Sequence, residues 1–127
     1  MTILNVVALN GFDPVSYFDG GPKKGDASIN SEHDGATYHF VSEDNKAKFD
    51  ADSQKYLPEY GGYCAVAMSE GKVFGADPET YTIQDGRVVL FYNGIHGNTL
   101  DQWKENPEER LLDADDHWKN ETYTAHT

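Results

Sequence analysis

The segment TYTIQDGRVVLFY, residues 80–92, predicts two strands joined by a tight turn. β-branched and aromatic residues are typical of strands. The Asp85-Gly86 pair between them has the chemistry of a two-residue hairpin, whose turn residues tolerate positive φ. The same layout occurs earlier in the chain, where Asp34-Gly35 separates SINSEH from ATYHFVS. The sequence therefore predicts two antiparallel β-hairpins.

Helical signals follow each hairpin. Ser42 suits the N-cap of a helix that carries Phe49, because its hydroxyl can accept a hydrogen bond from the first turn. After the second hairpin, Thr99 and Gln102 have the spacing of a capping box, and Trp103 comes next. We therefore expect one helix after each hairpin.

A further helix is predicted to start at residues 106–109, Asn-Pro-Glu-Glu, since Asn suits the cap and Pro the first turn. Leu111, Ala114, Asp115 and Trp118 then recur at helical spacing, which gives that helix an apolar side with one acid on it. The expected fold class is α+β, with antiparallel β-hairpins and helices after each. The residues expected in or near the core are aromatic or leucine: Phe40, Phe49, Tyr56, Leu57, Phe91, Leu100, Trp103, Leu111 and Trp118.

The two halves of the chain resemble each other. The spacing from Gly35 to Phe40 equals that from Gly86 to Phe91, and the spacing from Phe49 to Leu57 equals that from Trp103 to Leu111. An Asp-Pro-x-x-Tyr motif also occurs in each half, at residues 13–17 and 77–81. We interpret this as a weak internal duplication of a hairpin-plus-helix unit, a pseudo-repeat. Chance recurrence of common turn chemistry is the alternative.

Size and charge limit the class of protein. A chain of 127 residues suits one domain with its own core, and we expect a single domain over residues 1–127. The 22 acidic residues outnumber the 10 basic ones, and a net charge of −12 at pH 7 repels nucleic-acid phosphates and anionic lipid. Neither nucleic acid nor a membrane is therefore an expected partner. The segment MTILNVVALN lacks the basic start of a secretory signal, so the chain as numbered is expected in the cytoplasm, or exported if a leader was removed.

Two stretches resemble a known module. Residues 13–18, DPVSYF, and 34–57, DGATYHFVSEDNKAKFDADSQKYL, are similar to the YHS domain, whose Tyr-His-Ser pattern here is Tyr38-His39-Phe40-Val41-Ser42. The continuation YLPEYGGYCAVA resembles stand-alone bacterial YHS proteins. The resemblance is closest over residues 11–68 and looser over residues 69–120. It implies a YHS-like fold and, since YHS modules attached to metal pumps and oxygenases are thought to handle metals, it implies a metal site.

The chain departs from that pattern where the family has cysteines. The corresponding positions hold Ser16, Val41 and Asn45. Copper(I) and zinc sites draw much of their binding energy from thiolates, so these substitutions remove the family's thiolate site. Cys64 is the only thiol that remains.

Cys64 itself has three interpretations that the sequence leaves open: a buried small hydrophobe, a ligand of a metal or small molecule, or a reactive thiol. A helix beginning at Gly61-Gly62 and running to Met68 would place Cys64 in its first turn, where the helix dipole lowers a thiol pKa. The flanking residues 65–67, Ala-Val-Ala, favour close packing instead.

Candidate site residues follow from these patterns. The expected metal ligands, for copper or zinc, are Cys64, His39 and Met68, because Met68 would share the helical face of Cys64. Tyr60 and Tyr63 are the expected small-ligand contacts, on a phenolic stripe that would start at Tyr56. The other histidines are less favoured as metal ligands. His33 points to the opposite face of the first hairpin from His39, and His96 is expected in an ordinary turn.

The first function hypothesis is a small non-catalytic binding protein of the YHS type, holding a metal ion or small ligand near Cys64. The alternative is a protein–protein interaction or homodimerisation module without metal, which uses the hairpins and the Trp118 helix. A thiol-dependent redox protein is a third hypothesis. Catalysis is less favoured, because the sequence has no nucleophile-elbow motif, phosphate-binding glycine loop, dinucleotide fingerprint or EF-hand.

Overall fold

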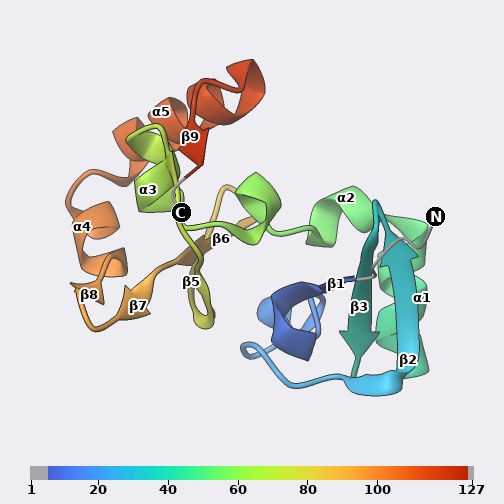
Figure 1. Cartoon of the computed structure of the whole chain (residues 1–127). Helices are drawn as coiled ribbons and strands as arrows, with labels where there is room; N and C mark the ends of the chain where they lie inside the picture. The colour runs from blue at the N-terminus through green and yellow to red at the C-terminus, as the bar shows by residue number, and fades with distance from the viewer. Residues whose placement is uncertain (1–5, 126–127) are drawn as a thin grey trace. The chain divides into compact units, whose positions relative to one another are not determined.

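Two β-hairpins turn at the two predicted Asp-Gly pairs (Figure 1). The first consists of β2 (Asp26–His33) and β3 (Ala36–Phe40), and the second of β5 (Asp77–Gln84) and β6 (Arg87–Phe91). All four turn residues have positive φ, between 49° and 81°. Both hairpin predictions are confirmed, as is the α+β class, in which small antiparallel sheets are combined with helices.

The computed structural model describes residues 6–125. Within the chain, contacts cluster into two units, Met1–Leu57 and Pro58–Thr127, and each unit contains one of the hairpins. The expectation of one domain with a fused core stays a prediction. The localisation expectation rests partly on residues 1–5, which lie outside the described part of the chain.

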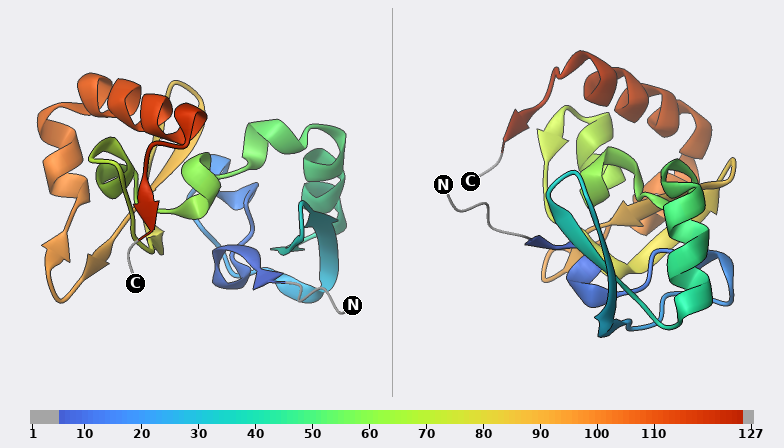
Figure 2. Two further views of the ribbon diagram at one scale, coloured as in Figure 1. Left: turned by 45° about the horizontal axis from the view of Figure 1, so that its top comes forward. Right: turned by 90° about the vertical axis from the view of Figure 1, so that its right-hand side faces the viewer.

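The first unit places a short strand and a helix against its hairpin (Figures 1 and 2). β1 (Val6–Val7) pairs in parallel with β3, so the sheet order is β1-β3-β2. Two 3₁₀-helices, η1 (Ala8–Gly11) and η2 (Ser16–Phe18), precede the hairpin, and α1 (Glu43–Ala51) and α2 (Ser53–Tyr56) follow it. The buried core residues of this unit are Val15, Tyr38, Phe40, Phe49 and Tyr56.

Local chemistry explains where α1 begins. The Ser42 hydroxyl accepts a hydrogen bond from the Asn45 N–H at 3.1 Å, as predicted for an N-cap. Glu43 and Asp44 lie in the first turn, where negative charge complements the helix dipole. The capping prediction at this helix is therefore confirmed.

The second unit is richer in short elements. It contains η3 (Glu59–Gly62), α3 (Ala65–Ser69), β4 (Lys72–Val73), the β5–β6 hairpin, β7 (Asn93–Gly94), β8 (Gly97–Asn98), α4 (Leu100–Glu105), α5 (Pro107–Asn120) and β9 (Thr124–Ala125). α3 packs against α5. The buried core of this unit includes Met68, Val89, Phe91, Trp103 and Leu111.

The predicted helix from Gly61 to Met68 is wrong in its start. Tyr60 and Gly61 have φ of 57° and 61°, in the left-handed region, and so they interrupt any right-handed helix. The helix begins only at Ala65, which leaves Cys64 as its N-cap residue rather than in its first turn. The expected one-sided tyrosine stripe is absent for the same reason, since Tyr60 is buried while Tyr63 is 42% exposed.

Two cap predictions and one core prediction in the second unit also need correction. The Thr99 hydroxyl donates to the Tyr92 carbonyl at 2.8 Å, so it does not form a capping box with Gln102. Asn106 precedes α5 as predicted, but its side-chain amide donates to the Glu109 carboxylate instead of capping the backbone. Trp118, near the end of α5, is 37% exposed and so does not belong to the buried core.

The two hairpins share one register. Asp26 pairs with Phe40 and Asp77 with Phe91, and a bulge follows each of these first pairs. The Asp-Pro-x-x-Tyr motifs, in contrast, occupy different places: residues 13–17 precede and enter η2, whereas residues 77–81 lie in β5. The two hairpins therefore have equivalent registers, whereas the two Asp-Pro-x-x-Tyr motifs do not occupy equivalent places.

Candidate functional site

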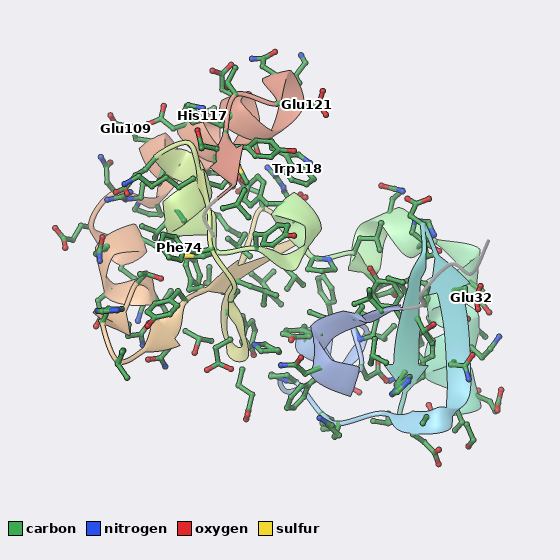
Figure 3. All side chains as sticks on the ribbon, in the orientation of Figure 1. Glu32, Phe74, Glu109, His117, Trp118 and Glu121 are labelled. Atoms are coloured by element: carbon green, nitrogen blue, oxygen red, sulfur yellow. The ribbon has the colours of Figure 1, made fainter. Side chains whose placement is uncertain are left out.

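A pocket of about 250 Å³ lies in the second unit beside Cys64. Its apolar wall is formed by Val66, Phe74 and Tyr92, and the Phe74 and Tyr92 rings have their centroids 6.4 Å apart. Phe74 is labelled in Figure 3. Because Phe74 is 40% exposed, the aromatic wall continues to the protein surface. The pocket thus combines an apolar wall with access from solvent.

Cys64 lies at the buried side of this pocket, with only 1% of its surface exposed. Its Sγ is 3.4 Å from the Thr99 Oγ1. The backbone around it is fixed on both sides, since its N–H donates to the Phe74 carbonyl at 2.9 Å and its carbonyl accepts from the Met68 N–H at 3.0 Å. The thiol therefore has a defined position in the pocket wall.

A short loop forms another side of the pocket. The Thr99 hydroxyl and N–H both donate to the Tyr92 carbonyl, at 2.8 and 3.0 Å, and so close the loop formed by β7 and β8. His96 lines the pocket from this loop, with its ring stacked on Tyr92 at a centroid distance of 6.3 Å. A Cβ on Gly94 would lie 2.6 Å from the Tyr92 hydroxyl oxygen, so a larger residue at this position would require the Tyr92 side chain to shift.

Charged and polar side chains complete the lining. Glu70 and Lys72 are exposed residues beside the pocket, and Gln102 reaches it from α4. The sequence predicted an ordinary turn at His96, and Gln102 was not predicted as a ligand contact. Tyr92, four residues before His96, was the available signal, since an aromatic ring next to a glycine loop can support a stacked imidazole.

The other predicted site residues are not in this pocket. Met68 is fully buried in the core of the second unit. The Tyr60 hydroxyl donates to Asp115, and the half-exposed Tyr63 forms an isolated bridge with Gly75. His39 belongs to the first unit, where it pairs with Asn30 as predicted. Of the five predicted site residues, Cys64 alone lines the pocket.

The donor set does not fit a copper or zinc site. Within residues 6–125, no three or more His, Cys, Asp or Glu side chains are grouped so that they could hold a metal ion. Structural zinc sites need four such ligands, and copper(I) favours thiolates and thioethers. Cys64 contributes one sulfur here, and Met68, the other predicted sulfur ligand, is enclosed in the core.

A separate polar cluster in the second unit has a structural role. The Tyr60 hydroxyl donates to the Asp115 carboxylate at 2.7 Å, and Arg87 donates to the same carboxylate from two nitrogens at 2.6 and 3.1 Å. Arg87 also binds Glu59 through Nε. This explains the acid on the apolar side of α5, since its charge is paired and hydrogen-bonded.

Titration of this cluster follows from its contacts. Burial disfavours ionisation of Asp115, but the hydrogen bonds from Arg87 and Tyr60 outweigh it and hold the Asp115 pKa below its ordinary value. Burial, reinforced by the hydrogen bond to Asp115, raises the pKa of Tyr60. The hydrogen bonds to Asp115 and Glu59 raise the pKa of Arg87. At neutral pH the cluster therefore consists of a neutral phenol, a carboxylate and a guanidinium.

Comparisons with protein-family models, with curated proteins and with solved structures find no match to this chain. Among the residues that the structure describes, no helix combines the length and the apolar composition needed to cross a membrane.

Proposed function

We propose that the protein is a small non-catalytic binding protein whose second unit holds a small molecule in the Cys64 pocket. The observation that supports this most is the pocket itself, about 250 Å³ in volume, with a buried thiol, an aromatic wall and a stacked imidazole around it. Ligand sites are typically apolar clefts with a few placed polar groups. The volume is below the ~300–1,000 Å³ of drug-sized sites, so the ligand is small.

A relation to YHS domains is part of this proposal, as is an internal repeat. The support for the repeat is the shared hairpin register, with Asp26 opposite Phe40 in one unit and Asp77 opposite Phe91 in the other. The support for the YHS relation is the sequence pattern at residues 34–57. A metal-holding role for the chain is the weaker form of the proposal, because the Cys64, His96 and Glu70 side chains that line the pocket are not grouped so that they could hold a metal ion.

The test is an NMR titration of ¹⁵N-labelled protein with a panel of small aromatic fragments. Binding in the pocket shifts the amide signals of Val66, Tyr92 and Gln102. Gln102→Trp places a large ring at an exposed position of α4 that lines the pocket, so it should weaken binding at least tenfold while the protein stays folded. Asp101→Trp, on the same helix but away from this lining, is the matched control. Equal binding by both variants would reject the site.

The metal form has its own test. Copper(I) and zinc are titrated into the wild type and Cys64→Ser, followed by calorimetry. A Cys64 metal site requires a loss of affinity in the serine variant, because the thiolate is the strongest expected donor. Equal weak binding by both proteins removes the metal form and leaves the small-molecule form to the fragment titration.

An interaction module is the second candidate function. Trp118, labelled in Figure 3, is 37% exposed on α5. Its ring stacks on Tyr123 at a centroid distance of 5.5 Å. Exposed aromatic residues are enriched at protein interfaces. Light scattering across a concentration series tests self-association, and a monomer at all concentrations, in both the wild type and Trp118→Ala, would argue against a homodimer.

A further inference from the structure

The first unit contains a buried carboxylate that is held by four donors. Asp13 has no exposed surface. Its Oδ1 accepts from the N–H groups of Val15 and Ser16, at 2.7 and 3.3 Å. Its Oδ2 accepts from the Val41 N–H at 2.9 Å and from the Asn45 side-chain amide at 2.8 Å. A buried charge is tolerated when its hydrogen-bonding capacity is filled in this way.

The backbone before each hairpin shows which residue of the second unit corresponds to Asp13. Residues 9–11 have φ of 57°, 51° and 87°, and residues 60–62 have φ of 57°, 61° and 83°. An isolated bridge follows at the same interval, between Phe12 and Lys24 in the first unit and between Tyr63 and Gly75 in the second. The hairpins continue this correspondence, since Asp26 and Asp77 occupy the same place in the two registers, as do Phe40 and Phe91. The difference in residue number between Asp26 and Asp77 is the same as that between Asp13 and Cys64, so Cys64 corresponds to Asp13.

The donors around Asp13 also have counterparts. With the same difference in residue number, Val15, Ser16 and Val41 correspond to Val66, Ala67 and Tyr92. The loop with β7 and β8 is then inserted before α4, so the helix N-cap moves from Ser42 to Thr99. Asn45 lies three residues after Ser42, and Gln102 lies three residues after Thr99, so Gln102 corresponds to Asn45.

The Cys64 pocket is lined by all five of these counterparts: Cys64, Val66, Ala67, Tyr92 and Gln102. The first unit fills the corresponding place with its own carboxylate, whereas the second has the Cys64 thiol there and a cavity beside it. We propose that this cavity binds the carboxylate group of a small aromatic monocarboxylate. The proposal rests on the proposed function, and it adds the chemical class of the ligand.

The remaining lining suits such a ligand. The ligand's carboxylate oxygens would accept hydrogen bonds from the N–H groups of Val66, Ala67 and Tyr92 and from the Gln102 amide. The counterparts of these groups donate in the same way to the Asp13 carboxylate. Phe74 and the Tyr92 ring form the wall for the aromatic body. Lys72 adds a cation next to the opening, which offsets part of the repulsion from the chain's net charge of −12.

The first experiment compares benzoate with benzamide, its neutral isostere, by NMR titration of the full ¹⁵N-labelled chain. The proposal predicts that benzoate binds at least tenfold more tightly and shifts the amides of Val66, Ala67 and Tyr92. Equal affinities, or tighter binding of benzamide, would overturn the carboxylate inference while leaving the pocket as a binding site. If neither compound nor any fragment of the panel shifts these amides, the proposed function fails as well.

A second experiment puts the carboxylate back into the protein. Cys64→Asp should fold, melt at or above the temperature of Cys64→Asn at pH 7, and lose benzoate binding, because its own side chain occupies the donors. A buried carboxylate without donors would be strongly destabilising. A Cys64→Asp protein that is unfolded, or that melts well below a folded Cys64→Asn, therefore contradicts the proposal.

Discussion

Replacing the buried carboxylate of the first unit should strongly destabilise the protein. In Asp13→Asn, one oxygen can still accept from Val15 and Ser16, but the new NH₂ group faces the Val41 N–H and the Asn45 amide, which are themselves donors. A buried donor left without an acceptor costs about 1–3 kcal/mol. With two such donors, the expected loss in the free energy of unfolding is about 2–6 kcal/mol.

Urea denaturation followed by circular dichroism measures this loss. Asp19→Asn is the matched control, because it makes the same charge change in the same unit at an exposed position, and surface changes of this kind are usually within about 0.5 kcal/mol. A small domain is stabilised by only about 5–15 kcal/mol, so the Asp13 variant should shift the urea midpoint clearly. If the free energy of unfolding of Asp13→Asn is less than about 1 kcal/mol below that of the control, the four hydrogen bonds to the Asp13 carboxylate do not stabilise the protein as described.

Three further predictions concern the second unit. Tyr60→Phe removes the hydroxyl that donates to Asp115 and should cost about 1–2 kcal/mol in urea unfolding, whereas an unchanged midpoint would show that the bond contributes nothing. The Asp115 pKa is lowered on folding, so the unfolded chain binds more protons than the folded protein below about pH 4. The stability of the wild type should therefore fall as the pH drops through that range. Thermal melts of Asp115→Asn should show a shallower fall. Gly94→Ala should displace Tyr92 and weaken fragment binding, because the new Cβ would lie 2.6 Å from the phenol oxygen; Ile95→Ala, at a 94% exposed position, should bind as the wild type does, and equal binding by both variants would exclude a role for the loop.

The parts of the fold that were predictable are those decided by neighbouring residues. An Asp-Gly pair sets its own turn, so both hairpins and the pairing of Asn30 with His39 follow from the sequence. Ser42 caps α1 through an amide only three residues away. These features need no information from distant parts of the chain.

The parts that sequence reasoning missed depend on residues that are far apart or on unusual backbone. Tyr60 has positive φ although it is not glycine, and its hydroxyl is bound by Asp115 from α5. A local helical pattern therefore predicted a tyrosine stripe that does not form. Thr99 likewise has a standard capping spacing, yet its hydroxyl is used by the Tyr92 carbonyl across the inserted loop.

The candidate site was predictable only at its centre. Cys64 was identified because it is the only thiol, but its surroundings come from separate segments that include α3, α4 and the loop of β7 and β8. Met68 was assigned to the site from its spacing to Cys64, and tertiary packing instead places it in the core. His39 was assigned from the YHS resemblance, and its place in a metal site stays a prediction.

A crystal structure of the protein soaked with benzoate would show directly whether the Cys64 pocket binds a carboxylate. We expect density for one benzoate beside Cys64, with its carboxylate at the backbone N–H groups of Val66 and Tyr92 and its ring against Phe74. A structure in which the pocket stays filled only by solvent while benzoate occupies another surface, or none, would contradict it.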